Sequence, residues 1–377
     1  MSNKNKTIFS ISMVKNEADI IESFVRYNMS VLDGMIILDN NSDDNTLKIL
    51  NALKDEGINL YLFESEKKGY FQYSILNMLL LKAVEEFKVD IIVPLDADEF
   101  IISNNGGNPR RFIEKIDPNT YLLAKWKTFV PDFSKNQDQK FIPAKITTAR
   151  DESYESYYKV IVPKEIVENY HAKLSKGNHG LIYNKKYEKN INQYISPDLR
   201  IAHFPLRTKD QTVTKVVSGW ISTINQIDRK ENESLHWKQI FDKIKDDNIT
   251  EKDVINCAND YAVKNKEFEV STYEDPLDLS FCDDVEIVYQ QKGVKPLSTI
   301  LETFEFISLE NTARRKQSIE EINQLNNTVK LLSSELEQTK KQEKLLKSKI
   351  LIYEQSKSWK FTSPIRRVRN IIRNLLN

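Results

Sequence analysis

The chain has 377 residues, 40% hydrophobic and 29% charged, a composition typical of a globular protein with a substantial core. Its 55 basic and 55 acidic residues balance, so no gross positive charge favours a nucleic-acid partner. The two cysteines, Cys257 and Cys282, exclude a disulfide framework and lack metal-site spacing. Since no signal-peptide pattern or transmembrane-length apolar run occurs, we expect a cytoplasmic chain, unless its tail takes it to a surface.

The first hundred residues alternate between strand and helix patterns. Strands are predicted over residues 8–14, 35–38, 60–63 and 91–95, and helices over 18–29, 46–56 and 71–86. This order predicts an α/β fold with a mostly parallel, Rossmann-like sheet and helices on both faces. Ligands of such sheets bind outside the carboxyl ends of the strands.

The strand predicted before residue 96 ends on two carboxylates, Asp96 and Asp98. On extended backbone they point the same way, because side chains alternate with period two. Together they form an anionic oxygen site suited to Mg²⁺ or Mn²⁺ carrying a phosphate. A solvated acidic turn is the alternative interpretation of this motif taken alone.

Polar residues also follow the first two predicted strands. They are Lys15, Asn16, Glu17, Asp39, Asn41 and Ser42. Because the carboxyl ends of parallel strands meet at one edge of a sheet, polar residues at three strand ends predict a ligand site there.

Later segments differ in character. Residues 121–204 are rich in strand patterns, residues 208–263 are mostly helical, and residues 275–295 form a loop-rich connection. We therefore predict four parts. They are a domain over residues 1–205, a mainly helical extension over 206–310, a coiled coil over 311–355 and a basic tail over 356–377.

The predicted coiled coil rests on an apolar 3–4 repeat that runs from Ile322 to Tyr353. Thr339 and Glu343 interrupt the repeat, whose surroundings are Lys, Glu, Gln and Ser. The pattern favours self-association into a homo-oligomer, with a helix lying on the globular domain as the alternative.

The tail carries six basic and no acidic residues between Ser356 and Asn377, with apolar residues at helical spacing and Trp359 just before them. A basic amphipathic helix of this kind is attracted to an anionic membrane surface. Docking on a partner or on the protein's own acidic patch is the alternative.

Three motifs together resemble glycosyltransferase family 2, in its bacterial branch with VKNE and DADEF motifs. They are SMVKNE at residues 12–17, DNNSDDNT at 39–46 and DADEF at 96–100. KGNH at 176–179 and HFPLRT at 203–208 resemble later blocks of that branch. SWKFTSPIR at 358–366 is similar to a segment at the ends of bacterial surface-polysaccharide glycosyltransferases.

The resemblance implies a GT-A fold and a metal-dependent, inverting transfer of a sugar from a nucleotide-diphospho-sugar to an acceptor hydroxyl. The donor nucleotide is open, with UDP as the first candidate. The implied setting is assembly of a bacterial surface polysaccharide, such as O-antigen or capsule, on a glycan or lipid-linked acceptor. The enzyme would lie at the inner face of the membrane.

The resemblance also implies roles for individual residues. Asp98 and Asp96 would hold Mn²⁺ or Mg²⁺, and His203 would add a metal or diphosphate contact, unless it is a core histidine. Asp39 would accept a hydrogen bond from the base or ribose. The remaining strand-end residues would line the nucleotide pocket.

The catalytic base is not evident from a motif. His179 ranks first because Gly177 and Gly180 beside it permit close approach to a ligand, and Asp132 and Glu152 follow.

Two further function classes stay open. A sugar nucleotidyltransferase would share the sheet and the metal site, although residues 12–17 lack the glycines of a phosphate loop. A non-catalytic coiled-coil scaffold with a degenerate GT-A domain is the other. A haloacid-dehalogenase phosphatase is disfavoured because its Asp-x-Asp usually follows the first strand.

Overall fold

The computed structural model divides the chain into two compact units, Met1–Phe306 and Ile307–Asn377. The structure describes residues 6–65, 72–152, 157–224, 235–246, 248–263, 270–282, 285–291 and 296–376.

The N-terminal part of the first unit is a parallel sheet of four strands, ordered β4-β1-β2-β3. Its elements in chain order are β1 (Ile8–Val14), α1 (Ile21–Met29), β2 (Gly34–Asp39), α2 (Thr46–Asp55), β3 (Leu60–Glu64), α3 (Gln72–Glu85) and β4 (Ile91–Pro94). The strand and helix predictions for this part are confirmed to within a few residues. Phe71, the predicted first residue of the third helix, lies outside the described residues.

Further strands extend this sheet beyond β4. In chain order the elements are β5 (Glu99–Ser103), α4 (Arg110–Ile113), β6 (Thr120–Val130), α5 (Ile142–Lys145), β7 (Thr148–Arg150), β8 (Tyr158–Pro163), α6 (Lys164–Tyr170), β9 (Lys173–Leu174), η1 (Lys176–Asn178), β10 (Leu181–Ile182), η2 (Lys185–Tyr187) and β11 (Asn192–His203). β8 lies antiparallel between β4 and β6, and β11 runs parallel to β6 and antiparallel to β5. β9 and β10 form a separate two-stranded sheet.

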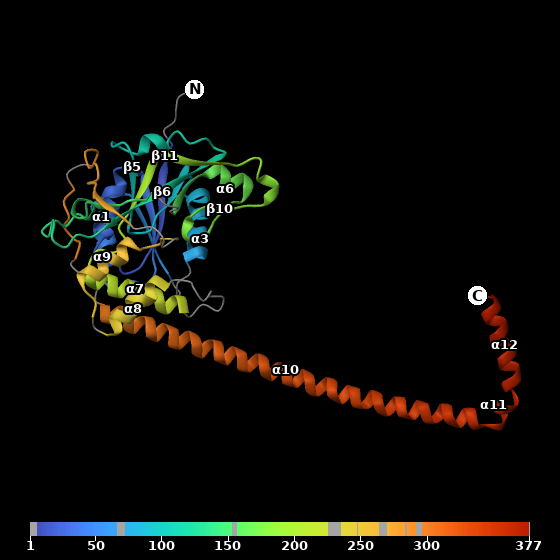
Figure 1. The fold of residues 1–377 in the computed structure, drawn as a ribbon. Coiled ribbons are helices and arrows are strands. Elements are labelled where there is room, and N and C mark those ends of the chain that lie inside the picture. The colour runs from blue at the N-terminus through green and yellow to red at the C-terminus, as the bar shows by residue number, and fades with distance from the viewer. Residues whose placement is uncertain are drawn as a thin grey trace. The chain divides into compact units, whose positions relative to one another are not determined.

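Side chains of the sheet alternate between two cores, one on each face. Along β2, Met35 and Ile37 join the core beneath α1 and α2, whereas Ile36 and Leu38 join the core beneath α3 and α6. Figure 1 shows α1 and α3 on opposite sides of the sheet. Burial of both faces explains the continuous apolar strand sequences. The predicted GT-A-type α/β fold class is confirmed.

The helical region packs on the end of this sheet. It comprises α7 (Lys209–Ile224), α8 (Leu235–Lys245) and α9 (Glu251–Asn259), which share a third core with Val130 and Leu206. β12 (Thr272–Glu274) then pairs with β7. These contacts explain why the first compact unit continues past residue 205, where the sequence suggested a boundary.

The second unit is helical. α10 (Pro296–Gln355) begins in the first unit and continues through the predicted coiled coil, and α11 (Lys357–Phe361) and α12 (Ser363–Leu376) follow it. The apolar repeat positions of α10, such as Leu325, Leu332 and Leu346, are exposed. None of the helices that the structure describes combines the length and apolar composition needed to cross a bilayer.

Candidate functional site

Asp96 and Asp98 lie in a turn between β4 and β5, and not on extended backbone. The Glu99 N–H donates to the Asp96 carbonyl at 3.0 Å, which closes the turn. The Glu99 carboxylate returns to accept from the Asp96 N–H at 2.9 Å and from the Trp126 indole N–H at 2.9 Å. The period-two argument therefore does not describe this motif, and the two aspartates meet different partners.

Asp96 is paired with a lysine that has no exposed side-chain surface. Lys159 Nζ on β8 lies 2.6 Å from Asp96 Oδ2 and 3.1 Å from Glu99 Oε2. Burial opposes the charge of Lys159, but the two carboxylates raise its pKa overall. Burial also raises the pKa of Glu99 to about 8, against the opposing effect of Lys159. Asp96 itself is 32% exposed, so it reaches the surface of this cluster.

Asp98 is deeper and faces His203 and Lys215. Lys215 Nζ lies 2.6 Å from Asp98 Oδ2, and His203 Nε2 lies 3.7 Å from the same oxygen. Burial opposes ionisation of Asp98, but Lys215 and His203 outweigh it and hold its pKa well below the usual range. Burial lowers the pKa of His203, which favours the neutral imidazole that a metal ion binds.

Asp98 and His203 suit a divalent cation as two of its ligands. Across the described ranges, no group of three or more His, Cys, Asp or Glu side chains is arranged to hold a metal ion. Magnesium sites that carry a substrate phosphate need only one or two carboxylates, because phosphate and water supply the other oxygens. The ammonium of Lys215 on Asp98 Oδ2 shows that a cation is accommodated there. Asp96 faces Lys159 instead and is not part of this pair.

The end of β1 meets the end of β11 through a buried arginine. Arg207 contacts Glu17 at 2.8 Å and Asp19 at 2.7 Å. Burial, opposed by Arg207, raises the pKa of Glu17 to about 7. The negative charge of Asp98 raises the pKa of Glu17 further.

The loops after β1 and β2 are hydrogen-bonded to one another. The Asn16 N–H donates to Ser42 Oγ at 2.9 Å, and Asn16 Oδ1 accepts from the Asp43 N–H at 2.9 Å. Asn16 and Asn41 both adopt positive φ, a conformation that asparagine tolerates. The structure thus brings the predicted residues of these two strand ends together, with Lys15 exposed beside them.

Asp39 offers an unused acceptor at the end of β2. Its Oδ2 accepts from the Ser42 N–H at 2.9 Å, whereas its Oδ1 is buried and has no hydrogen-bond partner within the described part of the chain. Burial, partly offset by Ser42, raises the pKa of Asp39. A buried carboxylate oxygen of this kind can accept a hydrogen bond from a ligand or from a water molecule.

His179 is held beside the aspartate cluster in one tautomer. Its Nδ1 lies 2.8 Å from the Tyr158 carbonyl oxygen, which can only accept, so Nδ1 carries the proton and Nε2 is left as an acceptor. The ring lies 4.7 Å from that of Tyr157 and 5.6 Å from that of Trp126. Burial lowers the pKa of His179, which favours its neutral, basic form at pH 7.

The other two predicted base residues differ in surroundings. Glu152 Oε1 accepts from the Thr128 N–H at 3.1 Å and lies 3.0 Å from buried Arg150. Among the residues that the structure describes, buried Glu152 Oε2 has no hydrogen-bond partner. Thr128 is the register partner of His203, so Glu152 lies near the cluster. Asp132 instead lies in a turn after β6, where its partners are Ser134 and Lys135.

Five residues of the cluster were not predicted from the sequence as site residues. They are Glu99, Trp126, Lys159, Arg207 and Lys215. A lysine directly before the apolar run at 160–162 was a usable signal, because a charge in a buried strand needs a partner. Arg207 stood within the HFPLRT block, and Lys215 gave no local signal.

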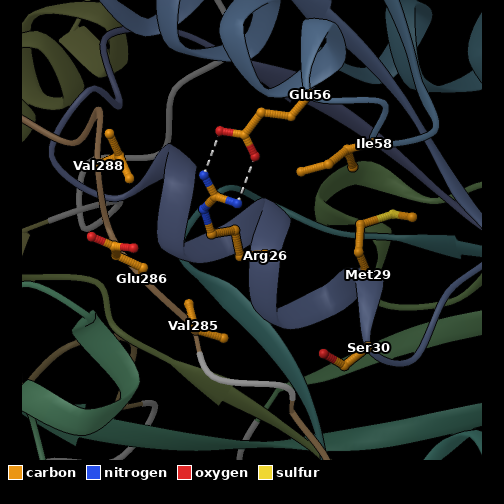
Figure 2. A pocket seen from close by; sticks show the side chains of 8 residues that line it. All are labelled: Arg26, Met29, Ser30, Glu56, Ile58, Val285, Glu286 and Val288. Atoms are coloured by element: carbon orange, nitrogen blue, oxygen red, sulfur yellow. Dashed lines mark hydrogen bonds and ion pairs between the residues drawn. The ribbon is translucent and has the colours of Figure 1, made fainter.

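A surface hollow of about 430 Å³ lies away from this cluster (Figure 2). Its walls are Arg26, Met29, Ser30, Glu56, Ile58, Val285, Glu286 and Val288. Met29 and Ser30 precede the start of β2, and Ile58 precedes the start of β3, so the hollow opens at the amino ends of the strands. Figure 2 shows the two hydrogen bonds by which Arg26 binds the Glu56 carboxylate in it. It is not the candidate site.

The raised pKa of Glu17 predicts a pH-dependent stability. The protonated form is favoured in the folded chain, so its stabilising contribution is complete below pH 4.5 and is lost as the pH rises through about 7. Glu17→Gln should therefore gain Tm relative to the natural chain between about pH 5 and about pH 8, measured in EDTA. Exposed Glu85→Gln is the control, and a Glu17→Gln difference that is flat with pH contradicts the assignment.

Comparisons with known proteins found solved structures that are similar to this chain only at low identity. No protein-family model matches the chain, and no curated protein matches it. The structure of residues 1–349 of S. aureus TarS with UDP is 15% identical over 62% of this chain and 69% of that chain, with a TM-score of 0.33. The mannosyltransferase PcManGT from Pyrobaculum calidifontis, with GDP-Man and Mn²⁺, is 13% identical over 68% and 73%, with a TM-score of 0.36. GalNAc-T7 with UDP, GalNAc and Mn²⁺ is 12% identical over 64% and 56%, with a TM-score of 0.33. The function proposed below therefore rests on the side chains of the site.

Proposed function

We propose that the chain is a metal-dependent, inverting glycosyltransferase that uses a nucleotide-diphospho-sugar, with UDP as the first candidate nucleotide. The observation that carries the proposal is the gathering of Asp39, Asp98 and His203 at one edge of the sheet. β1, β2 and β4 are adjacent and parallel, so their carboxyl ends meet at that edge. A donor of this class needs an acceptor for its base or ribose and a cation for its diphosphate at neighbouring points.

In this mechanism the oxygen of an acceptor hydroxyl attacks the anomeric carbon while the bond from that carbon to the diphosphate breaks. The nucleoside diphosphate leaves with the electron pair of the broken bond. Asp39 Oδ1 accepts a hydrogen bond from the base or ribose and so orients the donor. Asp98 and His203 would hold the cation, which supplies positive charge for the leaving diphosphate when it is bound.

The proton of the attacking hydroxyl passes to His179 Nε2 in this proposal. The Tyr158 carbonyl fixes the tautomer that leaves Nε2 basic, and burial favours the neutral ring. Glu152, whose Oε2 has no partner among the described residues, is the second candidate. Asp132 ranks last because its partners are Ser134 and Lys135 in a surface turn.

The tail supports a membrane-bound setting, with a lipid-linked glycan as the acceptor at the inner leaflet. α12 exposes Ile365, Val368 and Ile372 at helical spacing, and four arginines lie between Arg366 and Arg373. Each basic residue near an anionic surface contributes about 1 kcal/mol. Assembly of a bacterial surface polysaccharide, such as O-antigen or capsule, fits such a setting.

The coiled-coil interpretation is supported by the exposed repeat of α10. Apolar side chains at alternating three- and four-residue spacing gain burial when a second copy packs against them. A dimer or trimer would carry several weak tails and bind a membrane by avidity.

Nucleotide binding is the first prediction of the proposal. By calorimetry with UDP, GDP, CMP and dTDP, one nucleotide should bind in the presence of Mn²⁺, and Asp98→Asn should weaken that binding at least about tenfold. Asp117→Asn, at an exposed position, is the control and should bind normally. Folded protein that binds none of these nucleotides would favour the coiled-coil scaffold with a degenerate domain. Cleavage of a nucleoside triphosphate by a sugar phosphate would favour the nucleotidyltransferase.

The assignment of the base predicts a separation of binding from turnover. His179→Asn should lower kcat by about 10²–10⁴ and leave nucleotide affinity unchanged, because the ring acts on the acceptor proton. His171→Asn is the matched control, since His171 is exposed and has a φ of 51° that asparagine also adopts. A full rate in His179→Asn moves the role to Glu152.

The membrane proposal predicts that binding to an anionic membrane needs the apolar stripe of α12 in addition to its positive charge. Ile365→Asp with Ile372→Asp should bind phosphatidylglycerol vesicles at least about tenfold more weakly, because each buried isoleucine contributes about 1.5–3 kcal/mol. Asn370→Asp with Asn374→Asp makes the same charge change on the other face. Equal loss in the two variants, measured by vesicle co-sedimentation, argues against insertion of the stripe.

The proposed coiled coil would be held together by a seam, the apolar repeat positions of α10. It predicts that charged residues in this seam lower the mass of the protein in solution. Val329→Lys with Leu336→Lys should convert the oligomer to a monomer in light scattering, because the charges would be buried between helices. Asn327→Lys with Ser334→Lys, on the opposite face, should leave the mass unchanged. A persistent oligomer in the seam variant places the interface in the globular unit.

A further inference from the structure

The ammonium of Lys215 lies against Asp98, at the position where a bound metal ion would also lie. Its ammonium lies 2.6 Å from Asp98 Oδ2 and 3.0 Å from the Pro205 carbonyl oxygen, and 5.5 Å from the centre of the Tyr261 ring. A carboxylate, a carbonyl and an aromatic face are all groups that attract positive charge. The ammonium therefore stands where a metal ion bound by Asp98 and His203 would also lie.

The two lysines of the cluster differ in how firmly they are held. Lys159 projects from a central strand, has no exposed side-chain surface and contacts two carboxylates. Lys215 projects from α7, is 24% exposed and, among the described residues, contacts one carboxylate, that of Asp98. A lysine ammonium on a flexible four-carbon stem can move without repacking the backbone. Lys215 is therefore the cation that the site can release.

A divalent cation and the ammonium compete for the same carboxylate oxygen. Positive charges a few ångströms apart in a partly buried site repel one another by several kcal/mol. Asp98 Oδ2, which already accepts from Lys215, would have to release it on binding a metal ion. The released ammonium then needs a new anion, and a donor diphosphate beside Asp98 supplies phosphate oxygens that lysine binds well.

We propose that Lys215 exchanges with the divalent cation at Asp98 and then binds the diphosphate of the donor. Lys215 would thus keep the empty site neutralised and contribute positive charge to the leaving group when the donor is bound. Lys159 stays on Asp96 and Glu99 throughout and fixes the turn. The inference rests on the proposed function for its diphosphate half only, because the exchange itself involves Mn²⁺ and the chain alone.

The experiment measures Mn²⁺ binding by the loss of the free-ion EPR signal, first without nucleotide and then with the nucleoside diphosphate or monophosphate. Lys215→Met and Lys215→Gln should bind nucleotide-free Mn²⁺ about tenfold more tightly than the natural chain, because no ammonium competes for Asp98. With Mn²⁺ present, both variants should lose about tenfold of the preference for diphosphate over monophosphate. Lys209→Met, on the same helix and exposed, is the control.

The outcomes separate the inference from the proposed function. Unchanged Mn²⁺ affinity in the two Lys215 variants overturns the exchange, and an unchanged preference for diphosphate overturns the second contact. If Lys215→Met does not fold, Lys215→Gln decides, since its amide can still donate to Asp98. If the natural chain binds no nucleotide, the proposed function fails, and the Mn²⁺ measurement still decides the exchange.

Discussion

The packing of five carboxylates beside three cations is the constraint on which the candidate site depends. The carboxylates are those of Glu17, Asp19, Asp96, Asp98 and Glu99, and the cations are Lys159, Arg207 and Lys215. A buried charge without a partner costs several kcal/mol, so each of these carboxylates needs a cationic partner in the folded chain. Two negative charges remain in excess when every group is ionised. Burial is the main cause of the raised pKa values of Glu17 and Glu99, and the charges of neighbouring carboxylates raise both further. A divalent cation would relieve it.

This pairing divides the site into two groups of side chains. One group holds the turn, and the other contains Lys215, which we propose to leave Asp98 when a metal ion binds. Glu99, Lys159 and Trp126 are buried and hold the turn that carries Asp96. On the other side, Asp98, His203 and Lys215 form a smaller group that reaches helix α7. Asp39 and His179 each present one acceptor atom, and each is held by a partner on its other atom. A donor would thus meet groups whose orientation is already set.

The sequence predicted the strands and helices of the first hundred residues because both faces of their sheet are covered, which leaves long apolar runs and clear polar strand ends. It also predicted a shared site for Asp39, Asp98 and His203, of which the structure shows His203 Nε2 3.7 Å from Asp98 Oδ2. Their partners could not be predicted, because Lys159 is 63 residues from Asp96 and Lys215 is 117 from Asp98. The turn at Asp96 was missed for a similar reason, since Trp126 and Lys159 fix the Glu99 carboxylate that holds it. Local periodicity carries no information about such distant pairs.

The most direct test of the account is release of nucleoside diphosphate from a panel of nucleotide-sugars, followed by mass spectrometry. We predict that the natural chain with Mn²⁺ cleaves one donor, slowly with water and faster with a glycan acceptor, and that Asp98→Asn does not. Cleavage of no donor by folded protein would contradict the account, as would cleavage that Asp98→Asn leaves unchanged.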